Sequence, residues 1–164
     1  MKKWTLVLIS IILLILDKSF MPFLAIKDAY PSLLFIFAIA YSIINGQREG
    51  VIIGVLSGVL QDIFFYSGFG INSLINMLLC VVAALIGENI YKEKRLIPVI
   101  TSIVLYLIKV LAIGVIFSLV DLKIDIKVGV FTALYSAIIM FLSYKPIYRL
   151  YDNDYKKNNW RIRW

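Results

Sequence analysis

Apolar residues occur in six long runs along the chain, separated by short polar or glycine-rich stretches. The runs cover residues 4–26, 31–45, 50–66, 72–91, 96–120 and 128–148, each to within a few positions. A helix needs roughly 20 apolar residues to cross about 30 Å of hydrocarbon, and four of the runs reach that length. The runs at 31–45 and 50–66 are shorter, so we expect little tilt there or extension by flanking polar residues. The pattern predicts six transmembrane helices.

The apolar runs lack the alternation of a membrane β-strand, as "LLFIFAIA" at 33–40 shows. Backbone groups cannot stay unpaired in lipid, so these segments are expected to be helices. The amino-terminal run resembles a secretory signal, but no small-x-small cleavage site follows it, and we interpret it as a retained first helix. The predicted fold is an all-α, polytopic six-helix transmembrane bundle over residues 1–148, followed by a basic, aromatic tail at 149–164.

Composition supports a lipid environment. Hydrophobic residues make up 62% of the chain and charged residues 16%, whereas soluble domains are nearer half apolar and a quarter charged. Histidine is absent, which excludes histidine metal sites, Ser-His-Asp triads and Cys-His pairs. The single cysteine, Cys80, is expected to be a small buried apolar residue. We therefore expect no metal, no cofactor and no enzymatic activity.

The net charge of +7 reflects membrane orientation better than nucleic-acid binding, because the basic residues gather at the ends of the apolar runs. With the amino terminus inside, twelve basic residues fall on the cytoplasmic side: Lys2, Lys3, Arg48, Lys92, Lys94, Arg95, Lys145, Arg149, Lys156, Lys157, Arg161 and Arg163. Four fall on the outer side, namely Lys18, Lys27, Lys123 and Lys127, and Lys109 lies within a run. Both termini are predicted to be cytoplasmic.

A glycine stripe marks the third run. Gly50, Gly54 and Gly58 are four residues apart, and Asp62 follows at the same spacing. Residues at this spacing share one helix face. In lipid, small residues allow two helix backbones to approach closely. We interpret the three glycines as a helix-packing seam, with a groove that seats a ligand as the alternative.

Three charged residues lie inside apolar runs: Asp17, Asp62 and Lys109. Each stands 12 or 13 residues beyond the start of its run, which is about 18–20 Å at the helical rise. Charges at membrane depth are costly and usually face protein or water with a partner. We hypothesise one buried polar cluster in which Lys109 pairs with Asp62 or Asp17 and fixes helix register. A substrate or proton site is one alternative, and snorkelling of Asp17 and Lys18 toward the surface without pairing is another.

The carboxyl tail combines cations with aromatic rings. Its candidate contact residues are Arg149, Lys156, Lys157, Trp160, Arg161, Arg163 and Trp164. Such residues at a cytoplasmic boundary typically anchor to lipid headgroups. Docking of a cytoplasmic protein is the alternative, and binding of nucleic acid is not expected.

Three motifs carry a family resemblance. They are a "P-x-L-L" opening of the second helix, the stripe "G-x-x-x-G-x-x-x-G-x-x-x-D" at 50–62, and "G-x-G-I-N-S-L" at 68–74. Together they resemble the rod shape-determining protein MreD family of bacteria over nearly the whole chain, most specifically at 50–76. In one departure, Ser32 stands after Pro31 where many members carry an acidic residue, and Asp28 lies nearby.

The resemblance implies a non-enzymatic subunit of the cell-elongation machinery in the bacterial cytoplasmic membrane. Its implied partners are MreC, the filament protein MreB and the peptidoglycan synthase of the rod complex. The family is also similar in architecture to the substrate-binding membrane subunits of energy-coupling-factor vitamin transporters. The leading expectation is a scaffold for lateral wall synthesis. The alternative is a vitamin-binding subunit with an outward-open pocket lined by Asp62 and the loop between the third and fourth helices. Gln61, Asn72 and Asn76 are the few further polar groups that could converge on a ligand there.

Overall fold

The computed structural model describes residues 3–25, 30–65, 70–89, 96–118 and 126–161. Within these ranges the chain forms six α-helices and one short 3-10 helix, and no strand. The helices are α1 (Lys3–Ser19), α2 (Leu33–Asn45), α3 (Gln47–Phe65), α4 (Ile71–Glu88), α5 (Leu96–Ser118) and α6 (Ile126–Arg161), and η1 (Met21–Leu24) follows α1. The all-helical class expected from the sequence is confirmed for this part of the chain.

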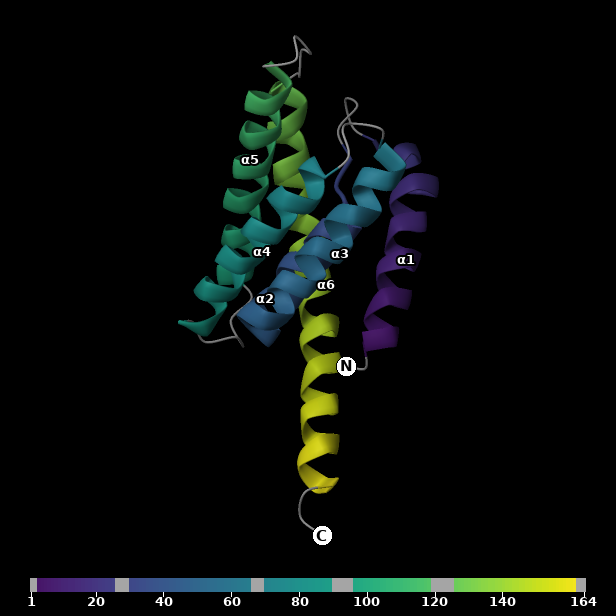
Figure 1. Ribbon diagram of the computed structural model, residues 1–164, viewed down its shortest axis with the longest axis vertical. Coiled ribbons are helices and arrows are strands. Elements are labelled where there is room, and N and C mark those ends of the chain that lie inside the picture. Colours follow the sequence, from purple (N-terminus) through teal and green to yellow (C-terminus); the bar gives the residue numbers. More distant parts are fainter. Residues whose placement is uncertain (1–2, 26–29, 66–69, 90–95, 119–125, 162–164) are drawn as a thin grey trace.

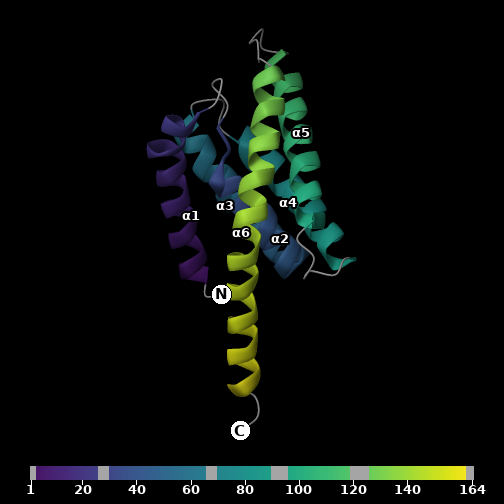
Figure 2. The same ribbon diagram turned by 180° about the vertical axis from the view of Figure 1, so that it is seen from behind.

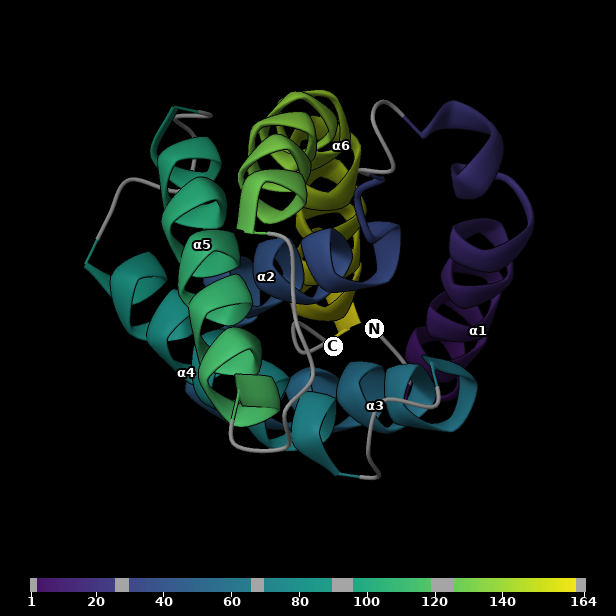
Figure 3. The same ribbon diagram turned by 90° about the horizontal axis from the view of Figure 1, so that it is seen from above.

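Helix α2 occupies the centre of the bundle. Seen along the long axis of the molecule, the other five helices surround it (Figure 3). All of its residues from Leu34 to Ile44 are buried. A helix that is apolar all round is one buried by other protein elements, which explains why this run has no polar face. On the α4 side the approach is so close that a Cβ at Gly87 would overlap the carbonyl oxygen of Ile43.

The glycine stripe of α3 lies against α4, and these two helices share the most extensive contact in the fold. A Cβ added at Gly54 would stand 2.7 Å from the Cα of Met77, and one at Gly58 would overlap the Cα of Ser73. Gly50 is also tight, with a carbonyl oxygen of α4 at 3.0 Å from its Cβ position. Only residues without a side chain permit this approach of backbones.

The outer surface of the bundle is apolar. Large hydrophobic side chains from every helix except α2 are exposed, including Phe23 at 86% and Val115 at 63%. Three helical stretches, Ile71–Glu88, Leu96–Ile116 and Val128–Arg149, are long and apolar enough to cross a membrane. Exposed apolar surface of this extent requires lipid as the surrounding medium.

Helix α6 is much longer than the membrane is thick. Its 36 residues span about 54 Å at the helical rise, and its carboxyl-terminal part extends beyond the other helices (Figures 1 and 2). Residues assigned from the sequence to a tail therefore continue the helix as far as Arg161. The start of α1 and the end of α6 lie toward the same end of the molecule (Figure 2).

The seam predicts different outcomes for two glycine-to-alanine changes. Gly58→Ala forces α3 away from α4, and we expect overpacking to lower the free energy of unfolding by about 1–3 kcal/mol. Gly114→Ala in α5 is the matched control, since a Cβ there meets nothing within 4 Å. It should leave stability unchanged or raise it slightly through helix propensity. Thermal unfolding midpoints in detergent would measure both, and equal midpoints would contradict the close seam.

Candidate functional site

Polar side chains from α1, α3, α4 and α5 meet the start of α2 inside the bundle. We call the set the polar network; its members are Asp17, Ser32, Ser57, Gln61, Asn76 and Lys109. All are buried, with exposed fractions of 7% or less, except the half-buried Ser32. Five helices thus contribute to one connected group of hydrogen bonds.

Asp17 on α1 caps the start of α2. Its carboxylate accepts hydrogen bonds from the backbone N–H groups of Leu33 (2.6 Å) and Leu34 (3.1 Å), and from the hydroxyl of Ser32 (2.8 Å). The first N–H groups of a helix have no partner within the helix, and the positive end of its dipole favours an anion. Ser32 is the N-cap residue itself, and its Oγ accepts from Phe35 N–H at 3.3 Å.

The capping carboxylate therefore comes from another helix. Asp17 of α1 places its carboxylate beside Ser32, at the start of α2. Asp28, the other acid near this helix start in the sequence, lies outside the described residues. Pro31 directly precedes the N-cap residue Ser32.

Lys109 on α5 is held by neutral groups. Its Nζ donates to Gln61 Oε1 and to Asn76 Oδ1, each at 2.8 Å. The ammonium also lies 4.1 Å from the ring centroid of Phe35 on α2, a cation–π contact that strengthens when water is excluded. Asn76 Nδ2 in turn donates to Gln61 Oε1 at 2.9 Å and to Ser57 Oγ at 3.4 Å.

Gln61 joins the two halves of the polar network. Its Oε1 accepts from Lys109 and Asn76, while its Nε2 donates to Ser32 Oγ at 2.9 Å. Since Ser32 donates to Asp17, the hydrogen bonds run without a break from α1 to α5. Among the residues that the structure describes, no buried side-chain nitrogen or oxygen lacks a partner. Each buried polar atom of the network thus has at least one partner within the protein.

Asp62 performs a second capping role, at the start of α4. Its carboxylate accepts from the backbone N–H groups of Gly70 (3.0 Å), Asn72 (2.9 Å) and Ser73 (2.9 Å), and from Asn72 Nδ2 (3.0 Å). Gly70 has a left-handed backbone with φ of 95°, which a residue with a side chain rarely adopts. The carboxylate that ends the glycine stripe thus fixes the start of the helix that the stripe packs against.

The structure brings Asp17, Asp62 and Lys109 into one buried region but does not join them as the sequence suggested. Within the described ranges, no ion pair links Lys109 to either carboxylate, and the two act on the ammonium only electrostatically at longer range. Both carboxylates are already engaged by helix N-termini, so the lysine takes amide oxygens. Gln61 and Asn76 were considered from the sequence only as pocket lining; polar residues inside apolar runs were the signal for them.

The predicted contact residues of the tail lie on or beyond the carboxyl-terminal part of α6. Arg149 is exposed on α6 at the end of the apolar stretch. Lys156, Lys157, Trp160 and Arg161 belong to the helical extension, but their side chains lie outside what the structure describes. Arg163 and Trp164 fall beyond the described residues altogether. Contact of these residues with lipid or a partner stays a prediction.

Comparison with known proteins identifies the family. Residues 1–153 match the family model described as rod shape-determining protein MreD. No curated protein and no solved structure matches the chain. The match covers the glycine stripe, both capping carboxylates and the whole polar network.

The polar network predicts that replacing Gln61 lowers the stability of the fold far more than replacing an exposed glutamine at the start of the same helix. Gln61→Leu removes one hydrogen bond each from Ser32, Asn76 and Lys109, which keep their other partners, and each lost hydrogen bond costs about 0.5–1.5 kcal/mol. Gln47→Leu is the matched control, because Gln47 is exposed on the same helix and its side chain bonds to Glu88, which is also exposed. We expect a clearly lower thermal midpoint for Gln61→Leu and little change for Gln47→Leu.

Combining Gln61→Leu with Lys109→Met tests whether the two side chains act together. Residues in one hydrogen-bonded network show non-additive effects on stability. The double variant should therefore lose less than the sum of the single losses, since it no longer buries an ammonium that has lost Gln61 as a partner. Strict additivity of the two losses would contradict the proposed coupling.

Proposed function

The chain belongs to the rod shape-determining protein MreD family, and on that premise we propose that it is a non-enzymatic membrane scaffold of the bacterial rod complex. Rod shape-determining proteins of this family are membrane proteins, and the apolar helices of this chain agree with that. The proposal is that the chain binds MreC and, directly or through it, supports MreB and the peptidoglycan synthase during lateral wall synthesis.

The connected polar network is the observation that carries the proposal. A scaffold must hold its helices at fixed depth and rotation so that its outer faces meet partners in one geometry. Polar side chains that bond across helices supply such a constraint inside lipid. In this chain the polar side chains connect α1 to α5 through Ser32 and Gln61, because they form hydrogen bonds with one another.

The vitamin-transporter alternative receives less support. It needs polar groups that converge on a ligand, and the sequence offered Gln61, Asn72 and Asn76 beside Asp62. These side chains bond to Lys109, to Asp62 or to each other. A cavity between α1 and α3 has a mainly aliphatic lining. Equilibrium binding of candidate vitamins to the purified chain separates the two functions, since tight binding of one would favour transport.

We further propose six membrane crossings with both termini in the cytoplasm. The charges that interrupt α1 and α3 are buried at Asp17 and Asp62, so they do not bar these helices from lipid. The start of α1 and the end of α6 point toward the same end of the molecule (Figure 1). An even number of crossings agrees with the distribution of basic residues.

Cysteine labelling tests this topology. In a Cys80→Ala background the chain has no other cysteine, so single cysteines can be introduced at Phe23→Cys and Arg149→Cys, both exposed positions. A membrane-impermeant thiol reagent should label Phe23→Cys in intact cells, and Arg149→Cys only after permeabilisation. Labelling of Arg149→Cys from outside would contradict the proposed orientation.

Removal and co-purification test the scaffold itself. Depleting the chain from its host should widen or round the cells, and the tagged chain should co-purify with MreC and the synthase. Gly114→Ala should retain both properties, whereas Gly58→Ala should lose partners as its helix seam opens. Normal cell shape after depletion, together with no recovery of MreC, would contradict the function.

A further inference from the structure

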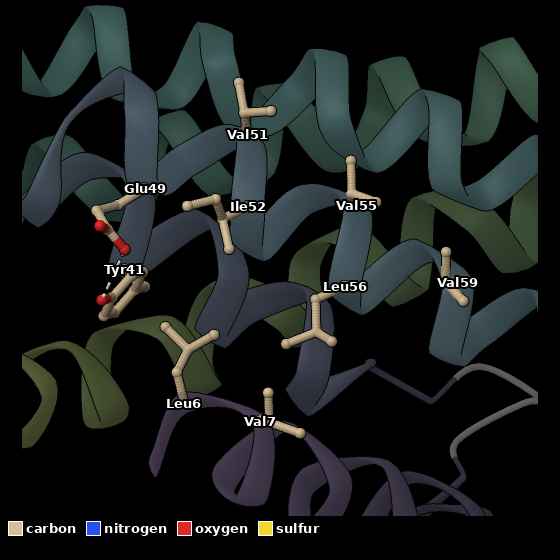
Figure 4. Close-up of a pocket in the computed structure, with 9 residues that line it drawn as sticks. All are labelled: Leu6, Val7, Tyr41, Glu49, Val51, Ile52, Val55, Leu56 and Val59. Carbon is tan, nitrogen blue, oxygen red and sulfur yellow. Dashed lines mark hydrogen bonds between the residues drawn. The ribbon is translucent and has the colours of Figure 1, made fainter. Parts of the chain in front are cut away.

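A groove of about 600 Å³ runs between α1 and α3 (Figure 4). Its lining residues are Leu6, Val7, Tyr41, Glu49, Val51, Ile52, Val55, Leu56 and Val59. Tyr41 and Glu49 lie together at one end of the groove and Val59 at the other (Figure 4). The end with Glu49 is the start of α3, which is the proposed cytoplasmic side.

The groove exists because α1 stands away from the bundle along part of its length. Helices α1 and α3 lie close at their outer ends and separate toward the start of α1 (Figures 1 and 2). Val51, Ile52 and Val55 therefore remain 38–41% exposed although α1 runs beside them. This gap leaves an apolar face of α3 uncovered by the chain itself.

The lining of α3 has the form of a helix-packing surface. Val51, Val55 and Val59 are four residues apart and form one ridge, and Ile52 and Leu56 form a second beside it. Packing of one helix against another places ridges of this spacing into grooves. From Val51 to Val59 the surface extends about 12 Å, a little over two helical turns. Its β-branched side chains have little rotamer freedom to lose on contact.

Glu49 gives the groove a charge at its cytoplasmic end. Its Oε2 accepts a hydrogen bond from the hydroxyl of Tyr41 at 3.3 Å. Within the part of the chain that the structure describes, no lysine or arginine pairs with this carboxylate, although the chain carries a net charge of +7. An anionic lipid headgroup would be repelled here. A transmembrane helix, in contrast, commonly brings Lys or Arg to its cytoplasmic end.

We propose that this groove seats one transmembrane helix of a partner protein. The helix packs an apolar face against α1 and α3 and places a Lys or Arg at its cytoplasmic end beside Glu49. The inference rests on the proposed scaffold function and deepens it, because it assigns the face and the charge through which a partner is held.

Site-specific photo-crosslinking in the full chain tests the occupant. A photoreactive residue replaces Val55 in the groove, with Val104 as the matched control, a valine of similar exposure on α5. We expect an adduct at Val55 whose partner peptide maps to a transmembrane segment with a basic cytoplasmic end, and none at Val104. Adducts only with lipid, only with a second copy of this chain, or equally at both positions would overturn the proposal.

Charge reversal tests the role of Glu49. Glu49→Lys should reduce recovery of the crosslinked partner at least tenfold, while Gln47→Lys, an exposed neighbour on the same helix, should not. Changing the basic residue of the partner to Glu should restore recovery with Glu49→Lys. An unchanged thermal midpoint for Glu49→Lys separates lost contact from lost fold. Undiminished recovery, or no rescue in a folded variant, would overturn the assignment.

The outcomes distinguish failure of the groove proposal from failure of the scaffold function. If the chain supports cell shape and recovers MreC but Val55 forms no helix adduct, the groove proposal fails and the scaffold stands. If depletion leaves cell shape unchanged and no partner is recovered, the scaffold function fails as well.

Discussion

The beginning of a helix inside a bundle surrounded by lipid is the constraint on which this structure depends. Its first N–H groups have no partner in the helix and no water to replace one. The chain meets this need twice with a carboxylate from another helix, at the start of α2 with Asp17 and at the start of α4 with Asp62. Because both carboxylates are so engaged, the ammonium of Lys109 is held by amide oxygens.

Packing follows from the same need. The N–H groups of α4 reach Asp62 only if the backbones of α3 and α4 lie close, and the glycine stripe allows that approach. The short helix α2 is then enclosed by its neighbours, and its capped start meets Gln61 through Ser32. Small residues and polar side chains thus act together where the hydrophobic effect between helices is weak.

A fixed interior with one loosely covered flank suits a protein whose task is to hold others. The polar network limits rotation and sliding of α2 to α5, while α1 leaves part of α3 accessible beside Glu49. Membership of the rod shape-determining protein MreD family agrees with this division. In the proposed scaffold, the polar network provides rigidity and the groove provides a contact for a partner.

The sequence by itself determined the helical class, the embedded charges, the glycine stripe and the family, because hydropathy, spacing and motifs are local properties. The resemblance was confirmed over residues 1–153. Only the tertiary structure decided which groups meet: an ion pair was expected for Lys109, but Gln61 and Asn76 receive it. It also decided the continuation of α6 and the opening beside α1. Such contacts depend on how the helices are rotated and displaced relative to one another. The depth of a residue along its own helix does not specify this arrangement.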